Sequence, residues 1–124
     1  MLCIVSFVLY FLTTPTPPQM VWQTAKVHDF GEISRSNVED EALEFTFVFK
    51  NNGDTPLVLD NVRTECGCTA SEWERQPLEK GQEGKIKISY STQKTGYFQQ
   101  KITVWVRGQR KPERLEIRGE ILEN

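Results

Sequence analysis

Strict alternation of apolar and polar residues is the feature that most constrains the fold of this 124-residue chain. Successive side chains of a strand point to opposite faces, so an alternating run describes a strand with one buried face and one solvated face. A helix would spread the same side chains around its axis and bury no consistent face. Such runs occupy 43–50, 85–90, 101–107 and 114–121. We therefore predict strands there, and no helix in the body of the chain.

Three further stretches are predicted as less regular strands, at 21–30, 57–62 and 69–73. Turn-forming residues separate the runs. The stretch 51–56 (NNGDTP) combines residues that tolerate positive φ with a proline that stops the strand. The stretch 108–112 predicts a hairpin between the last two strands.

These strands predict an all-β fold, an immunoglobulin-like antiparallel β-sandwich of about seven strands. A strand that is apolar on one side buries that side only when two sheets pack face to face. The inward-facing residues of the runs should then form the core. They are Leu43, Phe45, Phe47, Phe49, Leu57, Leu59, Ile86, Ile88, Tyr90, Ile102, Val104, Val106, Leu115 and Ile117.

The N-terminal stretch 2–12 (LCIVSFVLYFL) is apolar except for Ser6. It is shorter than the roughly 20 apolar residues that span a bilayer, and it has the length of the apolar part of a signal peptide. No basic residue precedes it and no typical cleavage site follows, so an N-terminal membrane anchor is the alternative to an export signal. The Pro- and Thr-rich 13–18 reads as an extended linker. We expect a leader and linker over 1–20 and the sandwich over 21–124.

The charge balance argues against nucleic-acid binding. The formal net charge is −2 and the isoelectric point is about 5.5, whereas nucleic-acid-binding domains usually carry a strongly basic patch. The chain has one histidine, which leaves little room for a Ser-His-Asp triad, and no Gly-x-Ser-x-Gly motif. We therefore do not expect an enzyme.

The segment Cys66-Gly67-Cys68 contains the residues best suited to carry out chemistry, and three interpretations stay open. The thiols could form a disulfide if Gly67 lets the chain bend, since residues two apart on a strand lie about 7 Å apart, at the upper limit for this bond. A disulfide that closes such a small loop would stabilise the fold little, and it could act as a labile redox couple. The thiols could instead bind copper or zinc with His28, although closed zinc sites usually need four ligands. In the third interpretation the segment is a structural turn.

A possible contact surface lies on the last two long strands. Trp105 falls on the same side of its strand as Lys101 and Arg107 and should point outward. Exposed tryptophan and arginine are typical of contact surfaces. Arg107 and Arg114 could contribute to a basic edge for an anionic glycan or protein, although neighbouring glutamates interrupt it. Trp105, Arg107 and Arg114 are the candidate partner-contact residues.

A family resemblance covers about 21–123. Its motifs are Phe47-x-Phe49-x-Asn51-x-Gly53, Pro56-Leu57, Cys66-Gly67-Cys68-Thr69 with Trp73 after it, Gly81-x-x-Gly84, Ile86-x-Ile88-x-Tyr90, Gly96-x-Phe98, Ile102-x-Val104 and Ile117-x-Gly119, with Phe30-Gly31-x-Ile33 upstream. In these motifs the chain resembles the bacterial family known as domain of unknown function 1573. The Cys-Gly-Cys-Thr segment together with the asparagine-glycine turn is the more specific part.

The resemblance implies an immunoglobulin-like sandwich related to the major sperm protein and pilus-chaperone architectures. It also implies export to the periplasm or cell surface of a Gram-negative bacterium, and it implies no activity. We expect a non-catalytic binding or structural module of the cell envelope, with an envelope protein or glycan as partner. The alternative is a thiol-redox or copper-handling protein that uses Cys66 and Cys68.

Overall fold

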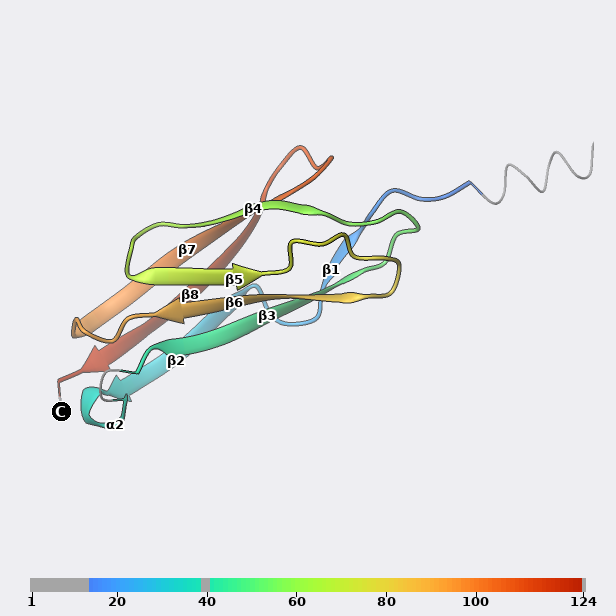
Figure 1. The fold of residues 1–124 in the computed structure, drawn as a ribbon. Coiled ribbons are helices and arrows are strands. Elements are labelled where there is room, and N and C mark those ends of the chain that lie inside the picture. Colours follow the sequence, from blue (N-terminus) through green and yellow to red (C-terminus); the bar gives the residue numbers. More distant parts are fainter. Residues whose placement is uncertain (1–13, 39–40, 124) are drawn as a thin grey trace, which may run out of the picture.

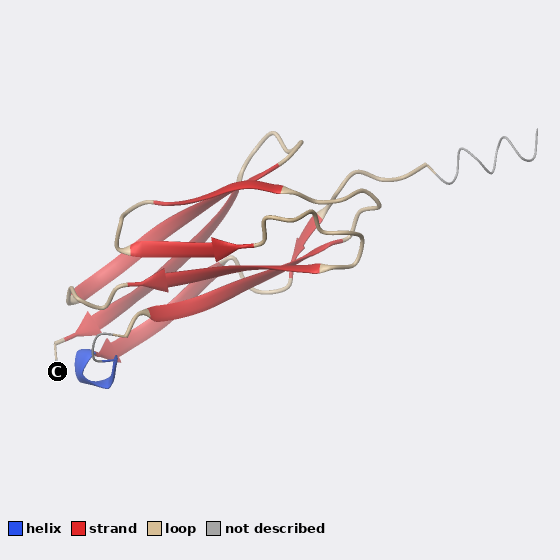
Figure 2. Cartoon of the chain, viewed as in Figure 1, coloured by secondary structure: helices blue, strands red, loops and turns tan. Residues whose placement is uncertain are grey.

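The computed structural model describes residues 14–38 and 41–123, which form two facing sheets of four strands each (Figures 1 and 2). Sheet A has the order β1 (Met20–Trp22), β3 (Leu43–Asn51), β6 (Glu83–Tyr90), β5 (Thr69–Trp73). Sheet B has the order β2 (Val27–Ser34), β8 (Glu113–Leu122), β7 (Gly96–Val106), β4 (Leu59–Thr64). The predicted β-sandwich is confirmed. The predicted leader at 2–12 lies outside the described residues.

The core lies between the sheets and is built by the alternating runs. Phe47 pairs with Ile86 across the β3–β6 ladder, and Ile102 pairs with Leu115 across the β7–β8 ladder. All four side chains are almost completely buried. Every predicted core residue is buried except Phe45, which is partly buried at the edge of the sandwich. The core also includes Val62, Leu78, Phe98 and Ile121.

The stretch 21–30, predicted as one strand, is divided between the two sheets. β1 pairs antiparallel with β3, and β2 pairs parallel with β8, where Val27 lies opposite Glu116. The connecting stretch 23–26 has no large apolar side chain to hold it in either sheet, so the chain crosses there. The described residues thus contain eight strands instead of about seven. One strand pairing is parallel in a sandwich that we expected to be antiparallel throughout.

A short helix, α2 (Arg35–Val38), follows β2. The prediction of no helix after the leader was therefore wrong at this point. Four residues make little more than one turn, which is too short to produce a 3.6-residue periodicity in the sequence. No helix among residues 14–38 and 41–123 is long and apolar enough to span a membrane.

The loops gather at the two ends of the sandwich (Figure 1). The N-terminal end holds the segment before β1, the β3–β4 and β5–β6 connections and the β7–β8 hairpin. The opposite end, here called the cysteine end, holds the β4–β5 and β6–β7 connections, α2 and the end of β8. Cys66 and Cys68 thus lie at the cysteine end, and Trp105, Arg107 and Arg114 lie on or beside the outer face of sheet B.

Candidate functional site

A disulfide joins Cys66 to Cys68 in the connection between β4 and β5, and their Cα atoms lie 5.3 Å apart. Since β4 belongs to sheet B and β5 to sheet A, the bond lies where the chain passes between the sheets. The backbone N–H of Thr69 donates to the Cys66 carbonyl at 3.2 Å, and that of Ser91 donates to the Cys68 carbonyl at 2.9 Å. Both the disulfide and these backbone hydrogen bonds therefore stabilise the turn.

Thr69 lies beside both sulfur atoms. Its hydroxyl oxygen is 3.7 Å from the Cys66 sulfur and 3.9 Å from the Cys68 sulfur, and the residue is 5% exposed. Within the part of the chain that the structure describes, this hydroxyl has no other hydrogen-bond partner. A buried hydroxyl thus lies beside the two sulfurs of the disulfide.

Two shallow hollows adjoin the disulfide, and Cys68 lines both of them. One has a volume of about 220 Å³ and is also lined by Ala42, Ala70 and Ser89. The other, of about 210 Å³, is lined by Gly67, Tyr90 and Lys94 among others. Both cysteines are half-buried and Gly67 is exposed, so the disulfide can be reached from solvent at the cysteine end.

His28 lies away from the cysteines. It sits in β2, one edge strand of sheet B, whereas the cysteines follow β4, the other edge strand, with β8 and β7 between. Its ring stacks on Phe45 at 3.7 Å and meets Phe30 edge-on at 4.6 Å. No group of three His, Cys, Asp or Glu side chains in the described residues is placed to hold a metal ion. The predicted copper or zinc site of Cys66, Cys68 and His28 does not fit this arrangement.

Trp105 lies on the outer face of sheet B and is 36% exposed, as its place in the alternating run predicted. It pairs with Asn61 of β4. One step along β7 on the same face, Thr103 lies between Arg63 of β4 and Arg114 of β8. We call Trp105, Thr103, Arg63 and Arg114 the Trp105 surface.

Some neighbouring charges on this face are paired. Arg107 donates to Asp60 at 3.0 Å, and Glu116 accepts hydrogen bonds from Gln99 and Arg118. The hydrogen bond from Gln99 is the main reason that the pKa of Glu116 is lowered. In contrast, Arg63 and Arg114 have no ion pair among residues 14–38 and 41–123. The Trp105 surface therefore has unpaired positive charge.

Sequence reasoning missed Arg63, because 57–62 was predicted to end one residue before it. The signal was present, since alternation along β4 puts Arg63 on the same face as Asn61. Arg107 was predicted as a contact residue; in the structure it pairs with Asp60 while its side chain stays largely exposed, so its contact role stays a prediction. It lies beside the prolines before β1, where Pro17, Pro18 and Arg107 help to line a hollow of about 310 Å³.

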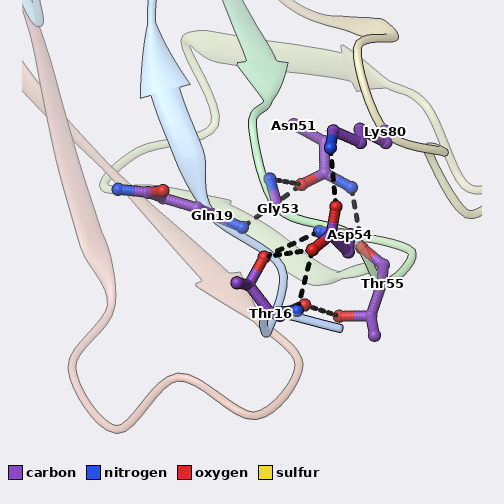
Figure 3. A network of polar contacts seen from close by, with 7 residues as sticks. All are labelled: Thr16, Gln19, Asn51, Gly53, Asp54, Thr55 and Lys80. Carbon is purple, nitrogen blue, oxygen red and sulfur yellow. Dashed lines mark hydrogen bonds and ion pairs between the residues drawn. The ribbon is translucent and has the colours of Figure 1, made fainter. Parts of the chain in front are cut away.

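The N-terminal segment, predicted as a linker, is bound to the sandwich from Thr16 onward (Figure 3). Asp54 accepts hydrogen bonds from the backbone N–H and the hydroxyl of Thr16, at 3.0 and 3.1 Å, and from Lys80 at 2.7 Å. These hydrogen bonds, led by that of Lys80, lower the pKa of Asp54 to about 2. We call the contacts of 16–19 with 51–55 the N-terminal clasp.

Asn51 organises the clasp from inside the protein. It is fully buried, and its side-chain amide donates to the carbonyls of Thr55 and Leu78, both at 2.9 Å. Its side-chain oxygen accepts from the backbone N–H groups of Gln19 and Gly53. Sequence reasoning read Asn51 only as a turn residue, although it continues the inward-facing positions of the run that contains Phe47 and Phe49.

Two facing four-stranded sheets, with an N-terminal segment that contributes a strand to each, define an immunoglobulin-like β-sandwich. The chain belongs to the family described as protein of unknown function (DUF1573), whose model matches residues 20–121. The resemblance inferred from the sequence motifs is thereby confirmed. No curated protein matches the chain by sequence.

Solved structures share the fold at low sequence identity. A protein of unknown function from Porphyromonas gingivalis W83 has a TM-score of 0.68 and 17% identity, over 89% of this chain and 50% of that chain. PapD-like domain 7 of human CEP192 has a TM-score of 0.62 and 12% identity, over 89% of this chain and 88% of that one. This chain spans half the length of the Porphyromonas protein.

Enzymes also occur among the structural neighbours. The VesB protease of Vibrio cholerae has a TM-score of 0.58 and 9% identity, over 95% of this chain and 34% of that chain. The likeness covers a third of the protease, and at this identity it shows the fold alone.

Proposed function

We propose that this chain is a non-catalytic binding module, exported to the bacterial cell envelope, whose Trp105 surface holds an acidic segment of another envelope protein. The observation that carries the proposal is the exposed indole of Trp105 next to Arg63 and Arg114, neither of which has an ion pair in the described residues. Trp and Arg supply much of the binding energy of protein interfaces.

The spacing of the two arginines suits an extended acidic peptide. Arg63 and Arg114 lie on strands that flank β7, so their backbones are about 10 Å apart, which is twice the spacing between neighbouring strands. Carboxylates two residues apart on an extended chain point to the same side and lie about 7 Å apart, a difference that the long arginine side chains can span. A partner strand that crosses sheet B could therefore pair one carboxylate with each guanidinium.

The shape of the surface favours a protein over a glycan. The surface lies on the outer face of a four-stranded sheet, which is broad, whereas sites for small ligands are usually concave. The adjoining hollow, of about 380 Å³, is lined by Val27, Lys101 and Arg114 among others and is open to solvent. It offers room for one further side chain of a bound protein segment.

Two features support export. The apolar stretch 2–12 has the length of a signal-peptide core, and the disulfide belongs to the class of bond that persists in oxidising compartments. The mass of the protein isolated from its host without reductant tests both points. Loss of the N-terminal stretch, or attachment to the membrane fraction, is the expected result. A full-length protein with free thiols in the cytoplasmic fraction would contradict export.

The binding proposal is tested by crosslinking in the living host. A photo-crosslinking amino acid at position 103, between the two arginines, should give one protein adduct. The adduct should disappear when Arg63→Glu and Arg114→Glu are combined, and it should weaken in high salt because the contact is electrostatic. The same group at position 46, on the outer face of sheet A, is the matched control.

Three outcomes would contradict the proposal: equal adducts from positions 103 and 46, an adduct that survives both charge reversals, or an adduct that contains carbohydrate and no protein. Circular dichroism of the double variant provides the folding control. Both arginine side chains lie on the solvent face of sheet B, so their replacement should leave the sandwich intact.

A further inference from the structure

We propose that the Cys66–Cys68 disulfide is a thiol–disulfide exchange site, which oxidises a dithiol of another molecule at the cysteine end of the sandwich. This activity is separate from binding at the Trp105 surface, because the two sites use different residues. The proposal starts from three observations, namely the small loop that the bond closes, the access to Cys68, and the hydroxyl beside both sulfurs.

The bond contributes little to holding the fold together. It links residues two apart in sequence, and the stabilisation that a disulfide gives falls as the loop that it closes becomes shorter. The turn also has its own hydrogen bonds. The Thr64 hydroxyl donates to the Thr69 carbonyl at 3.0 Å, and the Thr69 N–H donates to the Cys66 carbonyl at 3.2 Å. Reduction should therefore leave the sandwich folded, as a reversible redox site requires.

Access identifies Cys68 as the sulfur that is attacked. Cys68 lines both hollows at the cysteine end, and Gly67 and Lys94 line one of them with it. A Cβ atom at Gly67 would meet nothing within 4 Å, so the chain's own packing leaves space for a side chain there. The missing side chain keeps the path to the sulfur open. The positive charge of Lys94 favours an approaching thiolate.

Thr69 is placed to assist the departure of Cys66. A thiolate of the dithiol attacks the Cys68 sulfur, a new S–S bond forms, and the Cys66–Cys68 bond breaks. Cys66 leaves as a thiolate. The Thr69 hydroxyl, 3.7 Å from that sulfur and without another partner in the described residues, donates a hydrogen bond to the new negative charge.

A second exchange completes the reaction. The second thiolate of the dithiol attacks the sulfur that is bound to Cys68, and Cys68 leaves as a thiolate. The two protons lost by the dithiol are taken up by Cys66 and Cys68. The dithiol thus becomes a disulfide, the protein gains two electrons and two protons, and a disulfide of another molecule reoxidises the pair by the same steps in reverse.

The first test is equilibration of the full oxidised chain with mixtures of reduced and oxidised glutathione, followed by acid quenching and mass spectrometry. We expect the fraction of reduced Cys66–Cys68 to rise with the proportion of reduced glutathione in the mixture. The circular dichroism spectrum should stay unchanged. A disulfide that stays oxidised in a large excess of reduced glutathione would overturn the proposal. Loss of the native spectrum on reduction would also overturn it, because the bond would then be a structural staple.

The second test measures what the Thr69 hydroxyl contributes to the rate of exchange. Thr69→Val removes it with little change in shape, and Thr92→Val is the matched control. Thr92 is also buried at the cysteine end and lines one of the two hollows with Cys68, but its hydroxyl donates to the Glu41 carbonyl at 2.9 Å. We expect Thr69→Val to slow reduction by glutathione about fivefold, in line with the loss of one hydrogen bond to a charged group. The Thr92→Val variant should react at the wild-type rate, and equal rates for the two variants would exclude the role of Thr69.

The third test locates the attacked sulfur. With Cys66→Ser, oxidised glutathione should form a lasting mixed disulfide on Cys68 and release one reduced glutathione, because Cys66 is absent and cannot displace the bound glutathione. With Cys68→Ser, the remaining Cys66 should react at least several-fold more slowly. Equal rates for the two variants would contradict the assignment of Cys68. Combining Arg63→Glu with Arg114→Glu should leave exchange unchanged, so failure here and failure of the binding proposal are distinguishable.

Discussion

The side-chain oxygen of Asn51 accepts the backbone N–H of Gln19 at 3.2 Å, which ties the segment before β1 to the end of β3. The same side chain makes three more hydrogen bonds, to Gly53, Thr55 and Leu78. One buried amide thus holds together parts of the chain that lie up to 59 positions apart, from Gln19 to Leu78. The N-terminal end of the sandwich depends on it.

Replacing Asn51 with alanine should destabilise the protein by about 3 kcal/mol, because buried carbonyl and N–H groups would lose their partners. Urea unfolding of the full chain measures the free energy of unfolding. The matched control is Asn52→Ala at the exposed neighbouring position, which should cost less than about 0.5 kcal/mol. Similar losses for both variants would contradict the role assigned to Asn51.

Gly53→Ala should release the N-terminal clasp. A Cβ atom at this position would lie 2.0 Å from the Pro17 carbonyl oxygen, so either the segment before β1 or the turn must move. We expect faster cleavage within 14–19 by a nonspecific protease, while the core of the sandwich stays protected. Gly67→Ala is the control, since a Cβ there meets nothing within 4 Å. An unchanged cleavage rate for Gly53→Ala would show that the close approach is unimportant.

Acid should weaken the clasp through Asp54. Its pKa is about 2 in the folded protein, below the ordinary value of 3.8, mainly because of the hydrogen bond from Lys80. A carboxylate with a depressed folded pKa stabilises the fold above its unfolded pKa and loses that effect as the pH falls. Stability should therefore decline between about pH 4 and pH 2. The Asp54→Asn variant should show a smaller decline over the same range in thermal unfolding, and an equal decline would contradict the assignment.

Stability should also decline as the pH falls below about 6.5, through His28. Burial lowers the pKa of His28, and the nearby Asp29 opposes this effect. The unfolded chain then binds a proton more readily than the folded protein does, so protonation favours unfolding. His28→Phe should keep a ring against Phe45 and reduce the pH dependence between about pH 7 and pH 5. The measurement is the free energy of unfolding as a function of pH. Because the chain has one histidine, a pH dependence that is the same in this variant and the wild type would exclude His28 as its source.

The strands of the core could be predicted because alternation is a local property of the sequence. The run around Phe47 shows a buried face without knowledge of its partner Ile86, since the pleat alone requires it. The outward position of Trp105 followed from the same rule. The disulfide was one of several open interpretations of Cys66-Gly67-Cys68, because sequence spacing does not fix the backbone bend that closes it.

The features that escaped prediction depend on contacts between distant residues. Gly53 was read as a turn residue that permits positive φ, but in the structure its lack of a side chain admits Pro17, 36 positions earlier. Arg63 and Arg114 meet on one surface only because β4 and β8 flank β7. Thr69 is buried beside the sulfurs, which a polar residue at the start of a predicted strand did not indicate.

The parallel pairing of β2 with β8 has a consequence for biosynthesis. β8 is made after the seven other described strands, and it lies between β7 and β2. Until it emerges, both neighbours have unpaired backbone edges that can join to other chains. A nascent chain that stops before Glu113 therefore lacks a central strand of sheet B, and we expect it to aggregate more readily than a chain that includes β8.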